Sequence, residues 1–86
     1  MPRVSFFYGI LIAMFYNDHA PPHFHAVYGE HEAEVRIDTL EVLKGRLPRR
    51  ATGLVLEWAS LHREELTAMW ERARRHEQLG TIEPLD

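Results

Sequence analysis

Apolar and polar positions follow two different periods along this chain, and the change comes near residue 48. In the first half, short apolar or alternating runs are separated by glycine, proline, asparagine and aspartate. Runs of this kind predict β-strands, whereas the apolar spacing of three and four residues beyond Pro48 predicts helix. A strand-rich half followed by a helical half is typical of an α+β domain.

The strand-like half predicts an antiparallel meander of three to four strands over about residues 4–44. Residues 5–16 are aromatic and aliphatic, and Gly9 marks a bulge or a bend between two short strands. Alternating runs follow at residues 23–28 and 31–37, and a further strand is expected after the Asp38-Thr39 turn.

Gly29 and Glu30 suit a two-residue hairpin turn, and this turn fixes how the flanking strands pair. One side of the hairpin then becomes the core face and the other a solvated polar face. The expected core-face pairs are Tyr28 with His31, Ala26 with Ala33, and Phe24 with Val35. The expected polar-face pairs are Val27 with Glu32, His25 with Glu34, and His23 with Arg36.

The apolar stripe of the second half predicts one long helix or two consecutive helices over about residues 48–76. A single helix of that length would span about 42 Å and overhang a sheet whose strands are about 20 Å long. A break near residues 60–63, with Ser60 as a cap, is the alternative.

We expect the tail 77–86 to pack loosely or to extend along the sheet. The candidates for a partner interface on the stripe are Trp58, Met69 and Trp70.

Composition narrows the class of protein. A chain of 86 residues predicts a single domain, residues 1–86, with a small core. The absence of cysteine excludes a disulfide or a thiolate metal site, and it suits the reducing cytoplasm in which we place the protein. The apolar run near the start is too short to span a bilayer and precedes no small-residue cleavage site, so we expect no membrane association.

The formal net charge of −3 argues against a nucleic-acid footprint spread over the whole surface. Basic residues nevertheless cluster in "KGRLPRR" and "RARR". Solvated helix ends are the ordinary interpretation of such clusters. If nucleic acid is a partner, Arg36, Arg49 and Arg50 are the candidates for phosphate contact.

The stretch "NDHAPPHFHAVYGEHEAEVRI" holds four of the six histidines and carries the candidate chemistry. His23, His25 and Glu34 form a competent ligand set for a divalent metal, the one cofactor that the sequence suggests. The same histidines, oriented by Glu34 or Asp18, could act as acid and base in a small metal-independent ribonuclease. An ordinary His–Glu pair on a solvated strand face is the third interpretation, and the residues alone leave all three open.

Several familiar chemistries are disfavoured. The chain has no glycine-rich phosphate loop, no GxSxG elbow and no HExxH sequence. Its only serines are Ser5 and Ser60, which disfavours a serine nucleophile.

The segments "NDHAPPHFHA" and "LPRRATGLVLEWASLHREELTAMW" resemble the bacterial domain-of-unknown-function family 4160 from about Pro2 to Leu85. The resemblance implies a small protein encoded beside a second small protein, of family 2442, as the toxin-like half of a toxin–antitoxin-like pair. It therefore implies protein–protein interaction, with self-association and nucleic acid as further candidate partners, and it supplies no catalytic role. The signature positions are Asn17, Asp18, His19, Pro21, Pro22, His23, Phe24, His25, Trp58 and His62.

Overall fold

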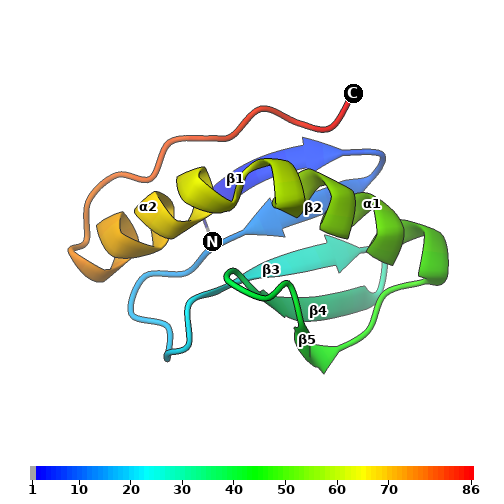
Figure 1. Cartoon of the computed structure of the whole chain (residues 1–86), viewed down its shortest axis with the longest axis horizontal. Helices are drawn as coiled ribbons and strands as arrows, with labels where there is room; N and C mark the ends of the chain where they lie inside the picture. Colours follow the sequence, from blue (N-terminus) through cyan, green and yellow to red (C-terminus); the bar gives the residue numbers. More distant parts are fainter. Residues whose placement is uncertain (1) are drawn as a thin grey trace.

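The computed structural model describes residues 2–86 and confirms the α+β class (Figure 1). Five antiparallel strands form one meander in the order β1-β2-β3-β4-β5, and two helices cross one face of the sheet. The expected antiparallel meander is confirmed, with five strands in place of three to four, and the two short strands on either side of Gly9 pair with each other. The elements are β1 Arg3–Phe7, β2 Ile10–Ala13, β3 His23–Tyr28, β4 His31–Arg36, β5 Val42–Gly45, α1 Arg49–Leu61 and α2 Arg63–Arg74.

The register of the central hairpin is the one that its turn predicts. All six expected pairs between β3 and β4 are present, from His23 with Arg36 to Tyr28 with His31. Val35 also lies opposite Val42 of β5, and an irregularity between Glu34 and Val35 disturbs the pairing of those two strands. The alternation of side chains across this register decides which residues face the helices.

The core lies between the helices and the face of the sheet that carries Phe24 and Val35. The Trp58 ring lies between those of Phe7 and Phe24, with centroids 5.3 and 5.9 Å away. The three residues expected at a partner interface are therefore placed inside the molecule, because Trp58, Met69 and Trp70 are all buried.

The helical half contains two helices, not one. His62 separates α1 from α2, and its backbone N–H bonds to the carbonyl of Ala59. Ser60 does not cap the second helix; its hydroxyl donates to the Glu57 carbonyl instead. Within residues 2–86, no helix is long and apolar enough to cross a membrane.

The tail that follows α2 lies along β1 (Figure 1). The Ile82 N–H donates to the Val4 carbonyl at 2.8 Å, and the Trp58 indole N–H donates to the Glu83 carbonyl at 2.8 Å. Leu79 and Ile82 are buried as a result. The tail thus covers one edge of the sheet, whereas the residues of β5 at the other edge are all exposed.

Gly45 tests the close packing of β5 on β4. It has φ +73°, and a Cβ at this position would overlap the backbone carbonyl of Glu32. We expect Gly45→Ala to lower the free energy of unfolding, measured in urea, by at least about 1 kcal/mol. Gly53 on the exposed side of α1 is the control, because a Cβ there meets nothing within 4 Å, and Gly53→Ala should add about 0.5–1 kcal/mol. Equal effects at the two positions would contradict the close approach of β5 to the Glu32 backbone.

Candidate functional site

His23 and His25 are buried, and this corrects the expectation of a solvated polar face. Their exposed fractions are 4% and 7%. Residues 14–22, which we call the 14–22 loop, connect β2 to β3 and fold back over the first residues of β3. The Phe15 ring meets the His25 ring edge-on at 4.5 Å between centroids, and Trp70 of α2 lies 5.3 Å from His23. Phe15 and Trp70, which are distant in sequence from part of this cluster, therefore help to bury the two histidines. Strand alternation had placed His23 and His25 on a solvated polar face.

Asp18 brings the 14–22 loop into contact with both histidines. Its Oδ2 lies 2.9 Å from His25 Nε2 and 3.1 Å from His23 Nε2. The three atoms that could bind a metal all lie within 4.8 Å of one another. Asn17, in the left-handed region at φ +62°, turns the chain immediately before Asp18.

The surroundings of Asp18 keep its carboxyl group ionised. Burial opposes ionisation, but the hydrogen bond with His25, the hydrogen bond from the His19 N–H and the proximity of His23 outweigh that effect. The pKa of Asp18 is accordingly lower than that of an ordinary aspartate. The loop thus presents an anionic oxygen to two imidazole nitrogens.

The outer nitrogen of each imidazole faces an oxygen acceptor. His23 Nδ1 lies 2.7 Å from the Pro21 carbonyl oxygen, and His25 Nδ1 lies 3.1 Å from Glu32 Oε2. A carbonyl can only accept, so His23 Nδ1 carries the proton and donates to Pro21. His25 contacts a carboxylate with each ring nitrogen, Glu32 at 3.1 Å and Asp18 at 2.9 Å, so its proton can lie on either nitrogen. In the neutral His23 ring this leaves the Nε2 lone pair directed toward Asp18.

His23 Nε2 is buried without a hydrogen-bond partner among residues 2–86. Its distance to Asp18 Oδ2 is short enough for a hydrogen bond, but the direction of the contact does not meet the geometry of one. A lone pair on nitrogen and a carboxylate oxygen therefore face each other at 3.1 Å. With a neutral His23 ring such a contact is repulsive, and either a proton on Nε2 or a metal ion between the two atoms would relieve it.

The structure assembles part of the predicted site. Asp18, expected only as an orienting group, is closer to the histidines than Glu34, whose Oε1 lies 3.6 Å from His23 Nε2. Glu32 was missed as a site residue, although its position diagonal to His25 follows from the register. Diagonal neighbours on a sheet remain within reach of long side chains, and this is the signal that could have identified it.

The arginines expected to contact phosphate are not gathered around the histidines. Arg36 lies opposite His23, but its guanidinium donates to the Asp38 carboxylate, and this hydrogen bond lowers the pKa of Asp38. Arg49 and Arg50 line hollows that also contain His31 and Tyr28. Tyr28 is the last residue of β3 and His23 the first, so these arginines lie roughly 16 Å along the strand from the site.

A family model described as domain of unknown function (DUF4160) matches residues 9–71. The chain belongs to this family. The matched range includes the 14–22 loop, both buried histidines, Glu32 and Glu34, so the whole cluster lies within the DUF4160 domain. No curated protein and no solved structure matches the chain.

The protonation pattern of His23 can be tested by long-range proton–nitrogen NMR of the metal-free protein at mildly alkaline pH. We expect the neutral His23 ring to carry its proton on Nδ1, because Nδ1 donates to the Pro21 carbonyl whereas Nε2 has no hydrogen-bond partner within residues 2–86. The exposed His19, whose ring makes no hydrogen bond within residues 2–86, is the control and should show the usual Nε2–H form. A proton on Nε2 of His23 would contradict the geometry described above.

Proposed function

We propose that this DUF4160 protein binds a divalent transition-metal ion through Asp18 Oδ2, His23 Nε2 and His25 Nε2. The observation that carries the proposal is the convergence of two buried Nε2 atoms on one carboxylate oxygen while both Nδ1 atoms are held by oxygen acceptors. Histidine ligands of metals ordinarily donate their second N–H to a carbonyl or a carboxylate in this way. Glu32 and the Pro21 carbonyl would act as these supports.

The distances suit a first-row ion. Zinc binds imidazole nitrogen and carboxylate oxygen at about 2.0–2.2 Å, which places tetrahedral ligand atoms about 3.3 Å apart. Asp18 Oδ2 lies 2.9 and 3.1 Å from the two nitrogens, so these two pairs need shifts of only a few tenths of an ångström, and all three atoms lie within 4.8 Å of one another. Two imidazoles and one carboxylate match the preferences of zinc and of non-haem iron.

Three protein ligands would leave at least one coordination position for water or substrate. Sites of this type are reactive, because the bound ion lowers the pKa of a water molecule toward neutrality. Glu34 is the further carboxylate beside the cluster, 3.6 Å from His23 Nε2 and half-buried. Its position suits a base that accepts the proton of such a water, and the arrangement as a whole suits metal-assisted hydrolysis.

The test is metal binding by protein purified without a histidine tag. We expect about one equivalent of zinc or cobalt per chain by elemental analysis after dialysis. Free metal at about a hundred times its Kd should add about 2.7 kcal/mol to the free energy of unfolding. Asp18→Asn keeps the shape of the side chain but removes its charge, and it should weaken binding about 10–100-fold or more in calorimetry. His19→Ala, one residue away and outside the cluster, is the matched control.

A folded protein that takes up no metal and gains no stability from zinc, cobalt, manganese or ferrous ion would overturn this proposal. Equal affinities of Asp18→Asn and His19→Ala would place the binding elsewhere, for example on the exposed histidines.

We also propose that the chain is the toxin-like member of a toxin–antitoxin-like pair, with β5 as the contact. One observation supports this second function. β5 is the outer strand of the sheet and wholly exposed, and it carries the large apolar side chains Val42 and Leu43. An exposed strand edge of this kind accepts a strand of another chain through its free backbone groups.

Co-expression with the product of the neighbouring gene tests the pairing. We expect growth arrest by this chain alone, and relief of the arrest together with co-purification when the neighbour is present. Leu43→Lys on β5 should reduce co-purification at least about tenfold, whereas Leu61→Lys, at an exposed apolar position of α1, should not. Pairing that is insensitive to Leu43→Lys, or the absence of any complex, would contradict the proposal.

A further inference from the structure

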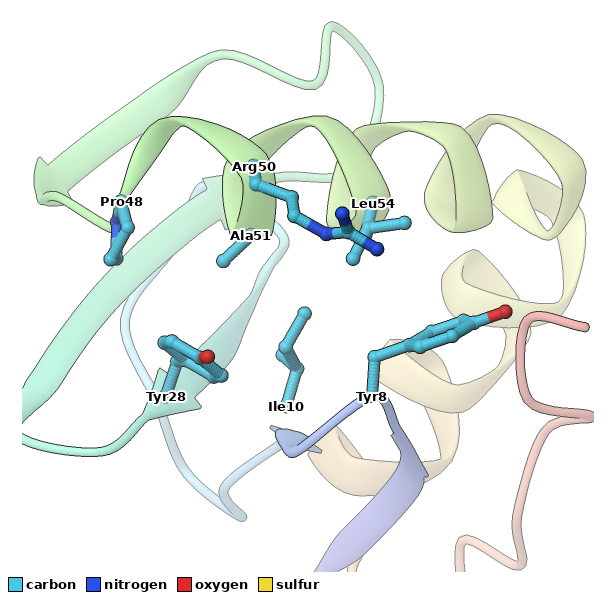
Figure 2. Close-up of a pocket in the computed structure, with 7 residues that line it drawn as sticks. All are labelled: Tyr8, Ile10, Tyr28, Pro48, Arg50, Ala51 and Leu54. Atoms are coloured by element: carbon cyan, nitrogen blue, oxygen red, sulfur yellow. The ribbon is translucent and has the colours of Figure 1, made fainter.

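A small apolar cavity lies at the end of the sheet opposite to the histidine cluster (Figure 2). It has a volume of about 200 Å³ and is bounded by the β1–β2 turn, the end of β3 and the first turns of α1. Ile10 and Ala51 form its floor, and Tyr8 and Tyr28 form its walls. We call this cavity the tyrosine socket.

The β1–β2 turn supplies one wall, Tyr8, and lets the other, Tyr28 of β3, approach closely. Tyr8 and Gly9 have φ values of +51° and +80°, which are the values that a two-residue hairpin turn requires. Tyrosine rarely adopts this conformation, and the turn here directs its ring beside the cavity while the hydroxyl donates to the Asp86 carbonyl at 2.6 Å. Gly9 lets the Tyr28 ring approach closely, because a Cβ at Gly9 would lie 3.3 Å from Tyr28 Cε1.

Both rings remain accessible from outside. The exposed fractions of Tyr8 and Tyr28 are 54% and 38%, although Ile10 between them is fully buried. Exposed tyrosines around an apolar depression are typical of surfaces that bind another protein, since their rings provide contact area at low entropic cost.

The size and polarity of the socket restrict its occupant. Cavities that hold drug-sized ligands measure about 300–1,000 Å³, so this one suits a single aromatic or branched side chain. Its floor is apolar, and the charged group at the opening is the Arg50 guanidinium on α1. A nucleobase in the socket would leave several polar edge atoms without partners, whereas an apolar side chain would not.

Basic residues gather on the α1 side of the socket, whereas Asp86 lies beside the hydroxyl of Tyr8. Arg46, Arg49 and Arg50 gather around the start of α1, and within residues 2–86 the arginine ion pairs involve Arg36 and Arg75 instead. α1 begins without a side-chain cap and without an acidic residue in its first turn, so its free N–H groups add to the positive potential. This concentration of basic groups in a chain of net charge −3 favours an anionic partner.

We propose that the tyrosine socket and its three arginines bind an acidic segment of a partner protein that inserts one aromatic or branched apolar side chain. The inserted side chain packs between Tyr8 and Tyr28, and the flanking carboxylates of the segment face Arg49 and Arg50. This surface is independent of the metal cluster, which lies at the other end of β3, and of the exposed edge of β5.

Fluorescence anisotropy with short labelled peptides tests this proposal. The probes are an acidic peptide with one central tryptophan, the same peptide with alanine at its centre, a lysine-rich peptide with the tryptophan, and a short oligothymidylate. We expect the acidic tryptophan peptide to bind at least about tenfold more tightly than each of the others, because it alone satisfies both the socket and the arginines.

Two variants and their controls locate the binding. Arg50→Glu and Tyr28→Ala should each weaken the acidic tryptophan peptide about tenfold or more. Arg74→Glu and Tyr16→Ala change the same residue types at exposed positions away from the socket and should leave binding unchanged. Arg50→Glu keeps the test valid if Tyr28→Ala disturbs folding.

Three outcomes would overturn the proposal. Equal binding of the alanine-centred peptide would mean that the arginines act without the socket. Tighter binding of the oligothymidylate would make this a nucleic-acid surface. Absence of binding by the acidic tryptophan peptide, or equal loss in the control variants, would leave the socket without this function.

Discussion

The contact of Asp18 with two imidazoles holds the 14–22 loop against the sheet, and the rest of the site depends on it. A single carboxylate oxygen lies within about hydrogen-bond distance of both Nε2 atoms. Without this contact the loop would have no polar attachment to His25, and two imidazoles would lie on an open strand face. Burial of polar rings is unfavourable unless their nitrogens find partners. Asp18, the Pro21 carbonyl and Glu32 contact three of the four ring nitrogens, and His23 Nε2 has no hydrogen-bond partner within residues 2–86.

The two faces of the sheet carry different side chains and are covered mainly by different segments of the chain. The helices cover one face through Trp58 and its aromatic neighbours, and the tail closes the edge of β1. The opposite face carries the histidines, which are covered by the 14–22 loop and, at His23, by Trp70 of α2. Because the main core lies on the helix side, substitutions that remove charge at the cluster leave most apolar packing intact. This separation makes the polar side of β3 a suitable place for chemistry in so small a domain.

Strand alternation and turn residues predicted how β3 and β4 pair. They did not predict that His23 and His25 are buried. Alternation and the Gly29-Glu30 turn determine which residues lie opposite each other, and all six pairs of the central hairpin followed from them. The same pattern cannot show that Phe15 and Asp18 cross over the histidines, because that path depends on contacts between the loop, β3 and α2. Of the predicted set of His23, His25 and Glu34, the structure places the two histidines side by side and brings Asp18 closer to them than Glu34.

The sequence also predicted the helical half only in part. The stripe of apolar residues predicted helix correctly, and its length suggested an overhang with exposed tryptophans. His62 divides the stripe into two helices, within the interval 60–63 given as the alternative, and Trp58 and Trp70 both turn inward. The apolar spacing lengthens to five between Leu61 and Leu66, which alone did not decide between one helix and two.

The most direct test of the metal site is an anomalous difference map from crystals of the tag-free protein grown with one equivalent of zinc and recorded at the zinc absorption edge. We expect one strong peak about 2.0–2.2 Å from Asp18 Oδ2, His23 Nε2 and His25 Nε2. Empty density at that point, with peaks confined to exposed histidines such as His31 or His76, would contradict a metal site at this cluster.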